Sequence, residues 1–293
     1  MQMAAASPRE GRLAIIAGDG KLPLYVAEAA RAAGEDPFIL PLRNEASQDW
    51  SGFDNAVIGV GDMAGLARLL KQHGIDRVVL SGGVRKRPGF SEIRANLRHL
   101  LKLPAVVRTL LAGGDDVVLK MVIELIEAQG ACVVGAHEIA PDLLATAGPI
   151  GKAVPTAEDR RDIARAAEAA EALGRLDVGQ GAVSVGGRIV ALEGVEGTDA
   201  MLARVAALRA EGRISRSRKG VLVKLCKPQQ DIRADLPTIG RSTVENAAKA
   251  GLAGIAVEAG RSLILDREAL TAMADEAGLF VCGLDRSLPG DGL

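Results

Sequence analysis

The stretch Leu13-Ala-Ile-Ile-Ala-Gly-Asp-Gly-Lys-Leu-Pro23 decides the fold of the first half of the chain. It begins with a short apolar run, which is typical of a buried strand, and passes through two closely spaced glycines into a helical pattern over residues 22–33. A strand that turns through glycines directly into a helix is the usual opening of an α/β sheet with parallel strands.

The same alternation continues to residue 134. Short apolar runs predict further strands at 38–40, 56–60, 78–80 and 131–134, and apolar residues at helical spacing predict helices at 63–73 and 115–129. Because successive parallel strands are joined by right-handed crossovers, these elements predict a Rossmann-like domain built on a parallel sheet.

The second half of the chain predicts a distinct, mixed α+β domain. Residues 146–155 are rich in Gly and Pro and indicate a linker. Gly186-Gly187 between two apolar segments predicts a β-hairpin with a primed turn. The remaining expected elements are helices at 157–173, 201–210 and 244–250, a strand at 220–226, and a strand pair formed by 255–257 and 263–265. We therefore expect an α/β protein with an N-terminal domain over 1–145, a linker over 146–156 and a C-terminal domain over 157–293.

Composition excludes several classes of function. Lys and Arg together number 36 and Asp and Glu 37, so no overall positive field attracts nucleic acid. Aromatic residues make up 2%, which argues against binding of single strands by base stacking. The three cysteines are far apart in sequence and form no CxxC pair, which indicates a reducing compartment. No apolar run approaches the ~20 residues that span a bilayer, and we expect a cytoplasmic protein.

Two glycine-rich loops are expected at the carboxyl edge of the first sheet. Gly18 and Gly20 lie where the first strand meets the first helix, and Gly82-Gly83 follow the strand at 78–80. Glycines at the start of a helix let backbone N–H groups approach a phosphate. The dinucleotide fingerprint GxGxxG fails, because Pro23 occupies the third glycine position. Two alternatives stay open: an NADP site, in which Arg43 accepts a 2′-phosphate, and a tight turn without a ligand.

Residues 85–111 form a basic amphipathic stretch, with apolar residues on one helical face and Lys or Arg off it. Such a helix suits an anionic membrane surface or a cleft for acyl chains. An ordinary surface helix that packs its apolar face on the sheet explains the same pattern.

Acidic and polar residues gather in two segments of the second half. The first runs from Asp177 through Gln180 and the hairpin to the run Glu193-Gly-Val-Glu-Gly-Thr-Asp199. Because this run follows a strand and opens a helix, helix capping by Thr198 or Asp199 is the alternative to a ligand site.

The second segment, residues 224–240, begins on a strand and continues as a polar loop. It concentrates Lys224, Lys227, Gln230, Asp231, Arg233 and Asp235. Carboxylates can hold Mg²⁺ while substrate phosphates complete its coordination, and Lys and Arg neutralise the non-bridging oxygens. The composition of the loop therefore fits cleavage of a pyrophosphate, and a solvated loop with incidental charges is the alternative. The histidines at 73, 99 and 137 lack the spacing of zinc ligands.

Several of these stretches together resemble one family. They are Ile16-Ala-Gly-Asp-Gly-Lys-Leu-Pro23, Gly82-Gly-Val84 with Lys86 and Pro88, Gly114-Asp-Asp116, Val178-Gly-Gln180, Glu193-Gly-Val-Glu-Gly-Thr-Asp199 and Lys227-Pro-Gln-Gln-Asp-Ile-Arg-Ala-Asp-Leu-Pro-Thr-Ile-Gly240. In this order they resemble the LpxI family of UDP-2,3-diacylglucosamine pyrophosphatases over nearly the whole chain. One departure is Arg87, which stands between Lys86 and Pro88 where the family pattern has Lys followed directly by Pro.

The resemblance implies a two-domain hydrolase that depends on Mg²⁺, with Mn²⁺ as a substitute. It would release UMP and 2,3-diacylglucosamine 1-phosphate (lipid X) in the lipid A biosynthesis of a Gram-negative bacterium. The implied partners are the lipid-linked sugar nucleotide and a second copy of the chain in a homodimer. Peripheral contact with the inner membrane would bring the enzyme to its lipid.

The expected site residues follow from the resemblance and the polar loops together. Asp231 is the leading catalytic and metal-binding residue, Asp235 is its neighbour in both roles, and Glu196 is a third metal ligand. The expected substrate-binding residues are Gly18, Gly20, Gly82, Gly83, Gln180, Thr198, Asp199, Lys224, Lys227 and Gln230. The alternative functions are an NADP-dependent oxidoreductase and a non-catalytic protein that binds sugar nucleotides or lipids.

Overall fold

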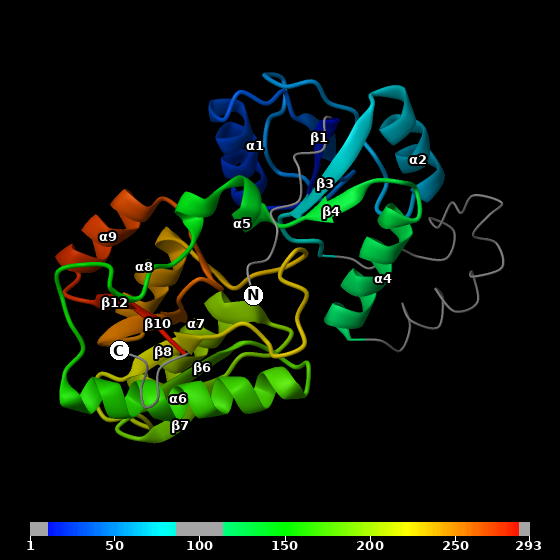
Figure 1. The fold of residues 1–293 in the computed structure, drawn as a ribbon. Helices are drawn as coiled ribbons and strands as arrows, with labels where there is room; N and C mark the ends of the chain where they lie inside the picture. Colours follow the sequence, from blue (N-terminus) through cyan, green and yellow to red (C-terminus); the bar gives the residue numbers. More distant parts are fainter. Residues whose placement is uncertain (1–10, 86–113, 287–293) are drawn as a thin grey trace, which may run out of the picture. The chain divides into compact units, whose positions relative to one another are not determined.

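The computed structural model describes residues 11–85 and 114–286. The chain forms two compact units, which are described separately (Figure 1). Unit 1 comprises Met1–Pro141 and Asp231–Asp235, and unit 2 comprises Asp142–Gln230 and Leu236–Leu293. The predicted basic helix at 85–111 lies, apart from Arg85, outside the described residues.

Unit 1 is built on a parallel sheet with the strand order β2-β1-β3-β4. Its strands are β1 (Arg12–Ala17), β2 (Phe38–Pro41), β3 (Ile75–Ser81) and β4 (Cys132–Val134), and its helices are α1 (Leu22–Ala32), α2 (Met63–Gln72), α4 (Asp115–Glu127) and α5 (Ala136–Ile139). Alternate strand residues face opposite sides, so that Ile15 packs with α1 and α5 and Ala14 packs with α2 and α4. The predicted Rossmann-like parallel sheet is thereby confirmed.

The strand predicted at 56–60 is wrong as a regular strand. The segment runs beside β2 but joins it only through isolated bridges, Ile39 with Asn55 and Leu42 with Ile58. The cause lies in β2 itself, since Pro41 has no N–H to donate to the ladder. Its carbonyl still accepts from the backbone N–H of Ile58 at 3.0 Å. The pairing is therefore interrupted at Pro41.

Unit 2 contains a mixed sheet with the strand order β5-β12-β10-β8-β6-β7. These strands are β5 (Gly148–Pro149), β6 (Gly181–Val185), β7 (Arg188–Leu192), β8 (Val221–Lys224), β10 (Gly254–Glu258) and β12 (Phe280–Leu284); β9 (Thr238–Ile239) pairs separately with β11 (Leu263–Ile264). The helices are α6 (Ala157–Arg175), α7 (Gly197–Ala210), α8 (Arg241–Lys249) and α9 (Arg267–Glu276), and a short 3-10 turn, η3 (Pro141–Leu143), stands where unit 2 begins. Strands β8, β10 and β12 are parallel and the others antiparallel, which confirms a distinct mixed domain.

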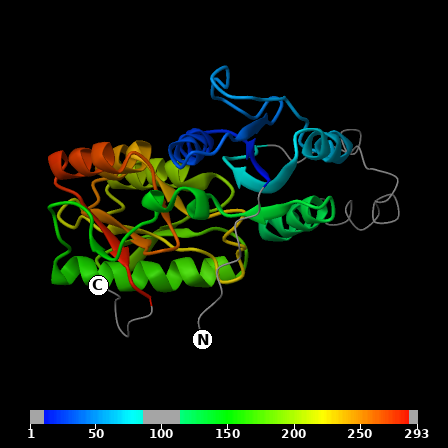
Figure 2. The same cartoon turned by 45° about the horizontal axis from the view of Figure 1, so that its top comes forward.

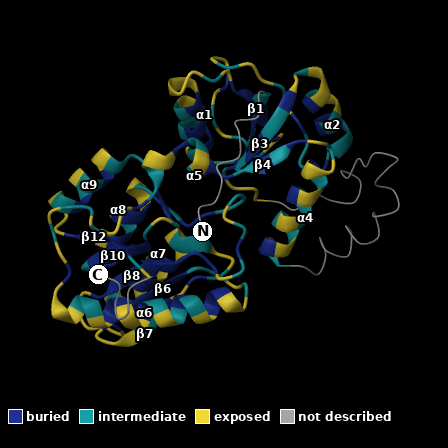
Figure 3. Ribbon diagram, viewed as in Figure 1, coloured by how far each residue is buried: buried dark blue, intermediate teal, exposed yellow. Residues whose placement is uncertain are grey.

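One face of the unit 2 sheet is covered by α6 and the opposite face by α7, α8 and α9 (Figure 2). Figure 3 shows the inner strands β6, β8, β10 and β12 buried between helices whose outer faces are exposed. The predicted hairpin is confirmed, because Gly186 and Gly187 both have positive φ, 60° and 80°, as a primed turn requires.

Some expectations for unit 2 are corrected by the sheet. Residues 255–257 and 263–265 do not pair, because β10 already has β8 and β12 on its two edges and β11 pairs with β9. Residues 148–149 of the expected linker form the edge strand β5 on β12. Helix α7 begins at Gly197 instead of residue 201, and α9 and β12 are additional elements.

Candidate functional site

The two glycine loops of unit 1 lie against each other at the carboxyl edge of the sheet. Gly18 N–H donates to the carbonyl of Ser81 at 2.8 Å, while Asp19 and Gly83 exchange backbone hydrogen bonds of 2.8 and 3.0 Å. A Cβ on Gly18 would lie 2.3 Å from the carbonyl oxygen of Gly83. At Gly82, which has a φ of +86°, a Cβ would lie 2.6 Å from the carbonyl oxygen of Asp19. Close approach of the two loops therefore accounts for glycine at both positions.

Hydrogen bonds in and around the two loops occupy backbone N–H groups that the sequence analysis expected to contact a phosphate. The N–H groups of Gly18 and Gly83 bond to carbonyls, and that of Gly20 bonds to the Ser47 hydroxyl at 3.1 Å. The loops follow β1 and β3, between which the strand order reverses, and a dinucleotide in a doubly wound sheet lies at this point. The geometry thus gives no support to the NADP alternative, and contact of these glycines with substrate stays a prediction.

Asp19, in the first glycine loop, adds a carboxylate to this edge of the sheet. Its carboxylate forms an ion pair with Arg85. A hydrogen bond from the Ser47 side chain, followed by one from Arg85, lowers the pKa of Asp19 below its ordinary value of 3.8.

Asp231, the leading predicted catalytic residue, belongs to unit 1 and is held by Arg233. The guanidinium donates from Nε to Oδ1 at 3.0 Å and from an Nη to Oδ2 at 2.7 Å, and the backbone N–H of Arg233 adds a bond of 3.0 Å to Oδ1. The Arg233 side chain is the largest cause that lowers the pKa of the Asp231 carboxyl. Arg233 also pairs with Glu127 on α4 at 3.0 Å. A bidentate pair of this kind fixes the orientation of the carboxylate.

The rest of this short segment is a turn packed on unit 1. The carbonyl of Asp231 accepts from the N–H groups of Ala234 and Asp235 at 3.0 and 3.3 Å. The side chain of Ala234 packs against the core between the sheet and helices α2 and α4. Asp231 and its predicted partner Asp235 are therefore brought into one turn.

Unit 2 contains a chain of buried polar groups at the ends of β7 and β8. Lys224 is 5% exposed and donates from Nζ to the Thr198 hydroxyl at 2.7 Å. That hydroxyl donates in turn to Glu193 Oε1 at 2.5 Å, and Glu193 is 6% exposed. Lys224 Nζ lies 4.0 Å from the same carboxylate oxygen. We call these three residues the lysine relay.

Glu193 is the member to which sequence reasoning gave no site role, although it opens the acidic run 193–199. Its Oε2 is buried and has no hydrogen-bond partner among the described residues. A Cβ on Gly181 would lie 2.6 Å from this oxygen, so a glycine is what leaves room for the carboxylate. The available signal was a glutamate placed directly after a strand, where an apolar core needs no charge.

A second buried lysine lies further along the same segment. Lys227, 8% exposed, donates to Asp177 at 2.6 Å, and its backbone N–H donates to the side-chain oxygen of Gln230 at 3.0 Å. The side-chain oxygen of Gln180 is buried without a partner among the residues that the structure describes. Each buried lysine of this segment thus has its own carboxylate, which offsets much of the cost of burying the charge.

Other predicted site residues have different partners. Asp199 accepts from Asn246 at 3.0 Å, and Glu196 pairs with Arg204 at 3.1 Å. Glu196 belongs to unit 2, whereas Asp231 and Asp235 belong to unit 1. Within residues 11–85 and 114–286, no three His, Cys, Asp or Glu side chains come together as a group that could hold a metal ion.

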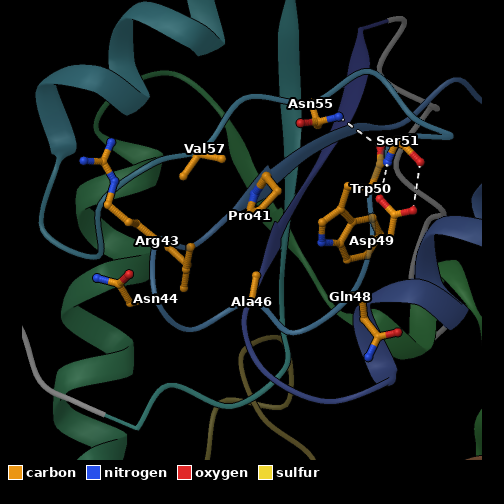
Figure 4. Close-up of a pocket in the computed structure, with 11 residues that line it drawn as sticks. Pro41, Arg43, Asn44, Ala46, Gln48, Asp49, Trp50, Ser51, Asn55 and Val57 are labelled. Atoms are coloured by element: carbon orange, nitrogen blue, oxygen red, sulfur yellow. Dashed lines mark hydrogen bonds between the residues drawn. The ribbon is translucent and has the colours of Figure 1, made fainter.

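A hollow of about 420 Å³ opens in unit 1 at the carboxyl end of β2 (Figure 4). Of the residues that line the hollow, sequence reasoning gave a ligand role only to Arg43. The lining residues are Pro41, Leu42, Arg43, Asn44, Ala46, Gln48, Asp49, Trp50, Ser51, Asn55 and Val57.

Cys132, Cys226 and Cys282 are free thiols, and burial raises the pKa of Cys282 to about 12. An un-ionised buried thiol is a packing group and a poor nucleophile.

In the part of the chain that the structure describes, no helix is both long enough and apolar enough to cross a membrane.

Comparison with known families covers both halves of the chain. A model described as the LpxI N-terminal domain matches residues 12–143, and one described as the LpxI C-terminal domain matches residues 146–282. The chain belongs to the LpxI family. The resemblance seen in its motifs is thereby confirmed.

A curated LpxI protein gives the same result. The chain is 43% identical over 276 residues to UDP-2,3-diacylglucosamine pyrophosphatase LpxI of Caulobacter vibrioides (strain ATCC 19089 / CIP 103742 / CB 15). The aligned region covers 94% of this chain and 98% of that protein. Among solved structures, UDP-glucose 4-epimerase of Thermus thermophilus with NAD is 15% identical with a TM-score of 0.29, covering 92% of this chain and 84% of that one. An isoflavone reductase is 12% identical with a TM-score of 0.28, covering 94% of this chain and 78% of that one. Likeness at this level carries no argument about function.

Proposed function

We propose that this LpxI chain uses water to cleave the pyrophosphate bond of UDP-2,3-diacylglucosamine, releasing UMP and 2,3-diacylglucosamine 1-phosphate. The observation that carries the proposal is the match to a relative named for this activity over 98% of that relative's length. The reaction would belong to lipid A biosynthesis.

The lysine relay suits the charge of such a substrate. Lys224 stands at the end of β8 with its ammonium on the Thr198 hydroxyl, and Glu193 lies behind that hydroxyl. A lysine fixed in this way can donate to a non-bridging phosphate oxygen without reorganising, which is how an enzyme stabilises charge that develops during the reaction. We assign Lys224 to a phosphate of the substrate, and Lys227 to the same role as its neighbour in the chain.

Asp231 is the residue to which we assign the catalytic carboxylate. Because Arg233 lowers the pKa of this carboxyl, it is ionised at neutral pH and can act as an acceptor towards an attacking water. Arg233 fixes the plane of the carboxylate through its two donors.

We also propose that the activity depends on Mg²⁺, with Mn²⁺ as a substitute. Asp231, Asp235 and Glu196 supply oxygen ligands of the kind that Mg²⁺ prefers, but the described residues form no preassembled group of three, and both oxygens of Asp231 already accept from Arg233. Sites for Mg²⁺ in phosphate chemistry commonly use one or two carboxylates together with substrate phosphates. When bound, the ion would neutralise charge on the pyrophosphate.

A lipid-linked substrate also has consequences for the whole protein. We propose a cytoplasmic enzyme that contacts the inner membrane peripherally, since its substrate carries two acyl chains. We also propose a homodimer, which sedimentation of the purified protein would test.

The direct test is an assay of UMP and lipid product with purified protein and UDP-diacylglucosamine, by mass spectrometry. We expect Asp231→Ala to lower turnover about 100-fold or more, in the range typical of general acid–base residues. The exposed Asp142→Ala, a control elsewhere in the chain, should remain active. EDTA should stop UMP release and Mg²⁺ should restore it. Substrate left intact by the parent protein would refute the hydrolase proposal, and full activity after metal removal would refute the metal dependence alone.

A further inference from the structure

The crevice that usually receives a nucleotide in this type of sheet is closed in unit 1. Strand β1 lies between β2 and β3, so the strand order reverses outside the carboxyl ends of β1 and β3. There the Gly18 loop and the Gly82 loop bond directly to each other through Asp19 and Gly83. At the contact between the loops, a Cβ on Gly18 or on Gly82 would overlap a backbone oxygen of the other loop, so no space for a sugar is left between these two positions.

The hollow lies at the same edge, one strand further along, where β2 ends in Pro41. Its volume of about 420 Å³ falls within the ~300–1,000 Å³ of sites for small molecules. Ligands of open α/β sheets bind outside the carboxyl ends of the strands. The hollow is therefore in a position for a ligand, while the adjacent crevice is filled by backbone.

The side chains of the wall combine flat apolar surface with neutral donors and acceptors. Trp50 and Val57 supply the apolar part, and Val57 is 56% exposed. Asn44 and Gln48 each present an amide, which offers a donor and an acceptor together. An imide such as uracil presents carbonyl acceptors on both sides of one N–H, which is the complement of such amides.

Two charged groups complete the wall. Arg43 provides a guanidinium, which suits a phosphate. Asp49 provides a carboxylate that already accepts from the N–H and hydroxyl of Ser51 at 3.0 and 2.9 Å. An ionised carboxylate has acceptor sites for more than these two donors, and a ribose hydroxyl can donate to one of them. Base, ribose and phosphate thus each have a matching group.

Trp50 supplies an independent observation. The residue is 5% exposed, and its indole N–H has no hydrogen-bond partner among the described residues. Figure 4 shows the ring between Pro41 and Asp49, with the nitrogen on the side of Pro41 and Arg43. A buried donor without an acceptor has lost its hydrogen bond to water and gained none in return, which destabilises the free protein. An acceptor oxygen brought to this wall by a ligand would satisfy it.

We propose that the hollow at the end of β2 binds the uridine part of the substrate, with the uracil against Trp50 and the amides of Asn44 and Gln48. The inference rests on the proposed function for the identity of the nucleoside. It assigns nucleoside recognition to a part of unit 1 that none of the predicted site residues occupies.

Trp50 is the chain's one tryptophan and therefore reports on this wall alone. Titration of the full-length protein with UMP should give a saturable change in tryptophan fluorescence. Ribose 5-phosphate and inorganic phosphate should give none at ten times the concentration that saturates with UMP. Equal responses to UMP and to ribose 5-phosphate would overturn recognition of the base. Binding of UMP in equilibrium dialysis without any fluorescence change would overturn the location.

Substitutions of residues that line the hollow test whether UMP binds there. Asn44 has a φ of 65°, so Asn44→Gly removes the amide without straining the backbone. We expect Asn44→Gly and Arg43→Gln each to raise the Kd for UMP at least fivefold, whereas Arg68→Gln, an exposed arginine on α2, should leave it unchanged. An unchanged Kd in both hollow variants would overturn the proposal.

The proposal and the enzymatic function can fail separately. Hydrolysis of UDP-diacylglucosamine with a KM unaffected by Asn44→Gly and Arg43→Gln would remove the hollow and keep the function. UMP binding at Trp50 in a protein that leaves the lipid intact would keep the hollow and remove the function.

Discussion

Single residues of unit 2 show how charge is kept inside the protein. Lys224 and Lys227 are both buried, and each has a carboxylate partner, Glu193 through the Thr198 hydroxyl and Asp177 directly. Removing one partner of a buried pair costs about 3–5 kcal/mol, because the other charge is left uncompensated. Burial of two lysines in one short segment therefore depends on both carboxylates being in place, and the proposed contact with substrate phosphates would give the two charges a function.

The hydroxyl of Thr198 connects Lys224 to Glu193 by hydrogen bonds, and it gives the first prediction. Thr198→Val keeps the shape but removes the acceptor of Lys224 and the donor to Glu193. We expect a loss of about 1–3 kcal/mol in the free energy of unfolding, and at least a tenfold loss of turnover, a ~1.4 kcal/mol effect on the barrier. Thr198→Ser restores both bonds and should stay close to the parent. Urea unfolding and UMP release measure the two effects, and a fully active valine variant would contradict the relay.

Asp19 gives a prediction about pH. Its pKa in the folded protein is depressed below 3.8 by Ser47 and Arg85, so its interactions stabilise the fold above pH 3.8. That stabilisation is lost as the pH falls through the lower, folded-state pKa. The free energy of unfolding of the parent should therefore exceed that of Asp19→Asn by a constant amount at neutral pH, and the difference should shrink below about pH 3.8. Urea titrations of both proteins from pH 7 to pH 3 test this, and a difference independent of pH would contradict it.

At the level of residues, the sequence identifies most of the polar groups but not their partners. Lys224, Lys227 and Gln230 were selected from the polar segment 224–240 and Thr198 from the acidic run 193–199, and all four are buried or half-buried in the structure. Glu193 was passed over because its relation to Lys224 depends on the register of β6 between β7 and β8. Pairing across strands is set by tertiary structure, and no local pattern records it.

At the level of elements, the glycine loops test whether close packing or ligand contact requires glycine. Gly82→Ala places a Cβ 2.6 Å from a backbone oxygen at a φ of +86°, whereas Gly83→Ala meets nothing within 4 Å. We expect a cost of at least about 2 kcal/mol for Gly82→Ala from strain and overlap, and at most about 0.5 kcal/mol for Gly83→Ala. Urea unfolding of the two neighbours gives a matched comparison, and equal stability would contradict the packing account.

Regular elements with a strong local pattern are also those that the sequence predicts well. The hairpin at Gly186-Gly187 and helices α1, α2 and α6 depend on turn chemistry and helical spacing. The segment at 56–60 has the apolar composition of a strand, but Pro41 on its neighbour interrupts the ladder. The pairing of β11 with β9 depends on both edges of β10 being occupied. These errors come from partners distant in sequence.

At the level of the whole molecule, the chain returns to unit 1 for five residues, Asp231–Asp235, and then continues in unit 2. The excursion carries the leading catalytic candidate, and its anchors are Arg233 on Glu127 and Ala234 in the apolar core. A division of the sequence at one linker does not describe this. Asp231 lies ninety positions beyond Pro141, where the N-terminal part of unit 1 ends, and composition gives no sign that the chain returns to this unit.

The ion pair between Arg233 and Glu127 on α4 gives the last prediction. Glu127→Gln removes one charge partner of Arg233 and leaves the bidentate bond to Asp231 in place. The side chains of Arg233 and Glu127 are 36% and 39% exposed, so the pair is worth about 0.2–1 kcal/mol. That energy corresponds to hydrogen exchange about 1.4- to fivefold faster at the amides of 231–235.

The control is Glu124→Gln, an exposed glutamate on the same helix, which should leave exchange at these amides unchanged. Arg233→Ala removes both the anchor and the clamp on Asp231, and it should accelerate exchange further and lower kcat more than it changes KM. If Arg233 served stability alone, exchange would rise in Arg233→Ala while kcat stayed at the parental value. If kcat instead falls as the exchange rate at residues 231–235 rises, Arg233 acts on the reaction by orienting the carboxylate of Asp231.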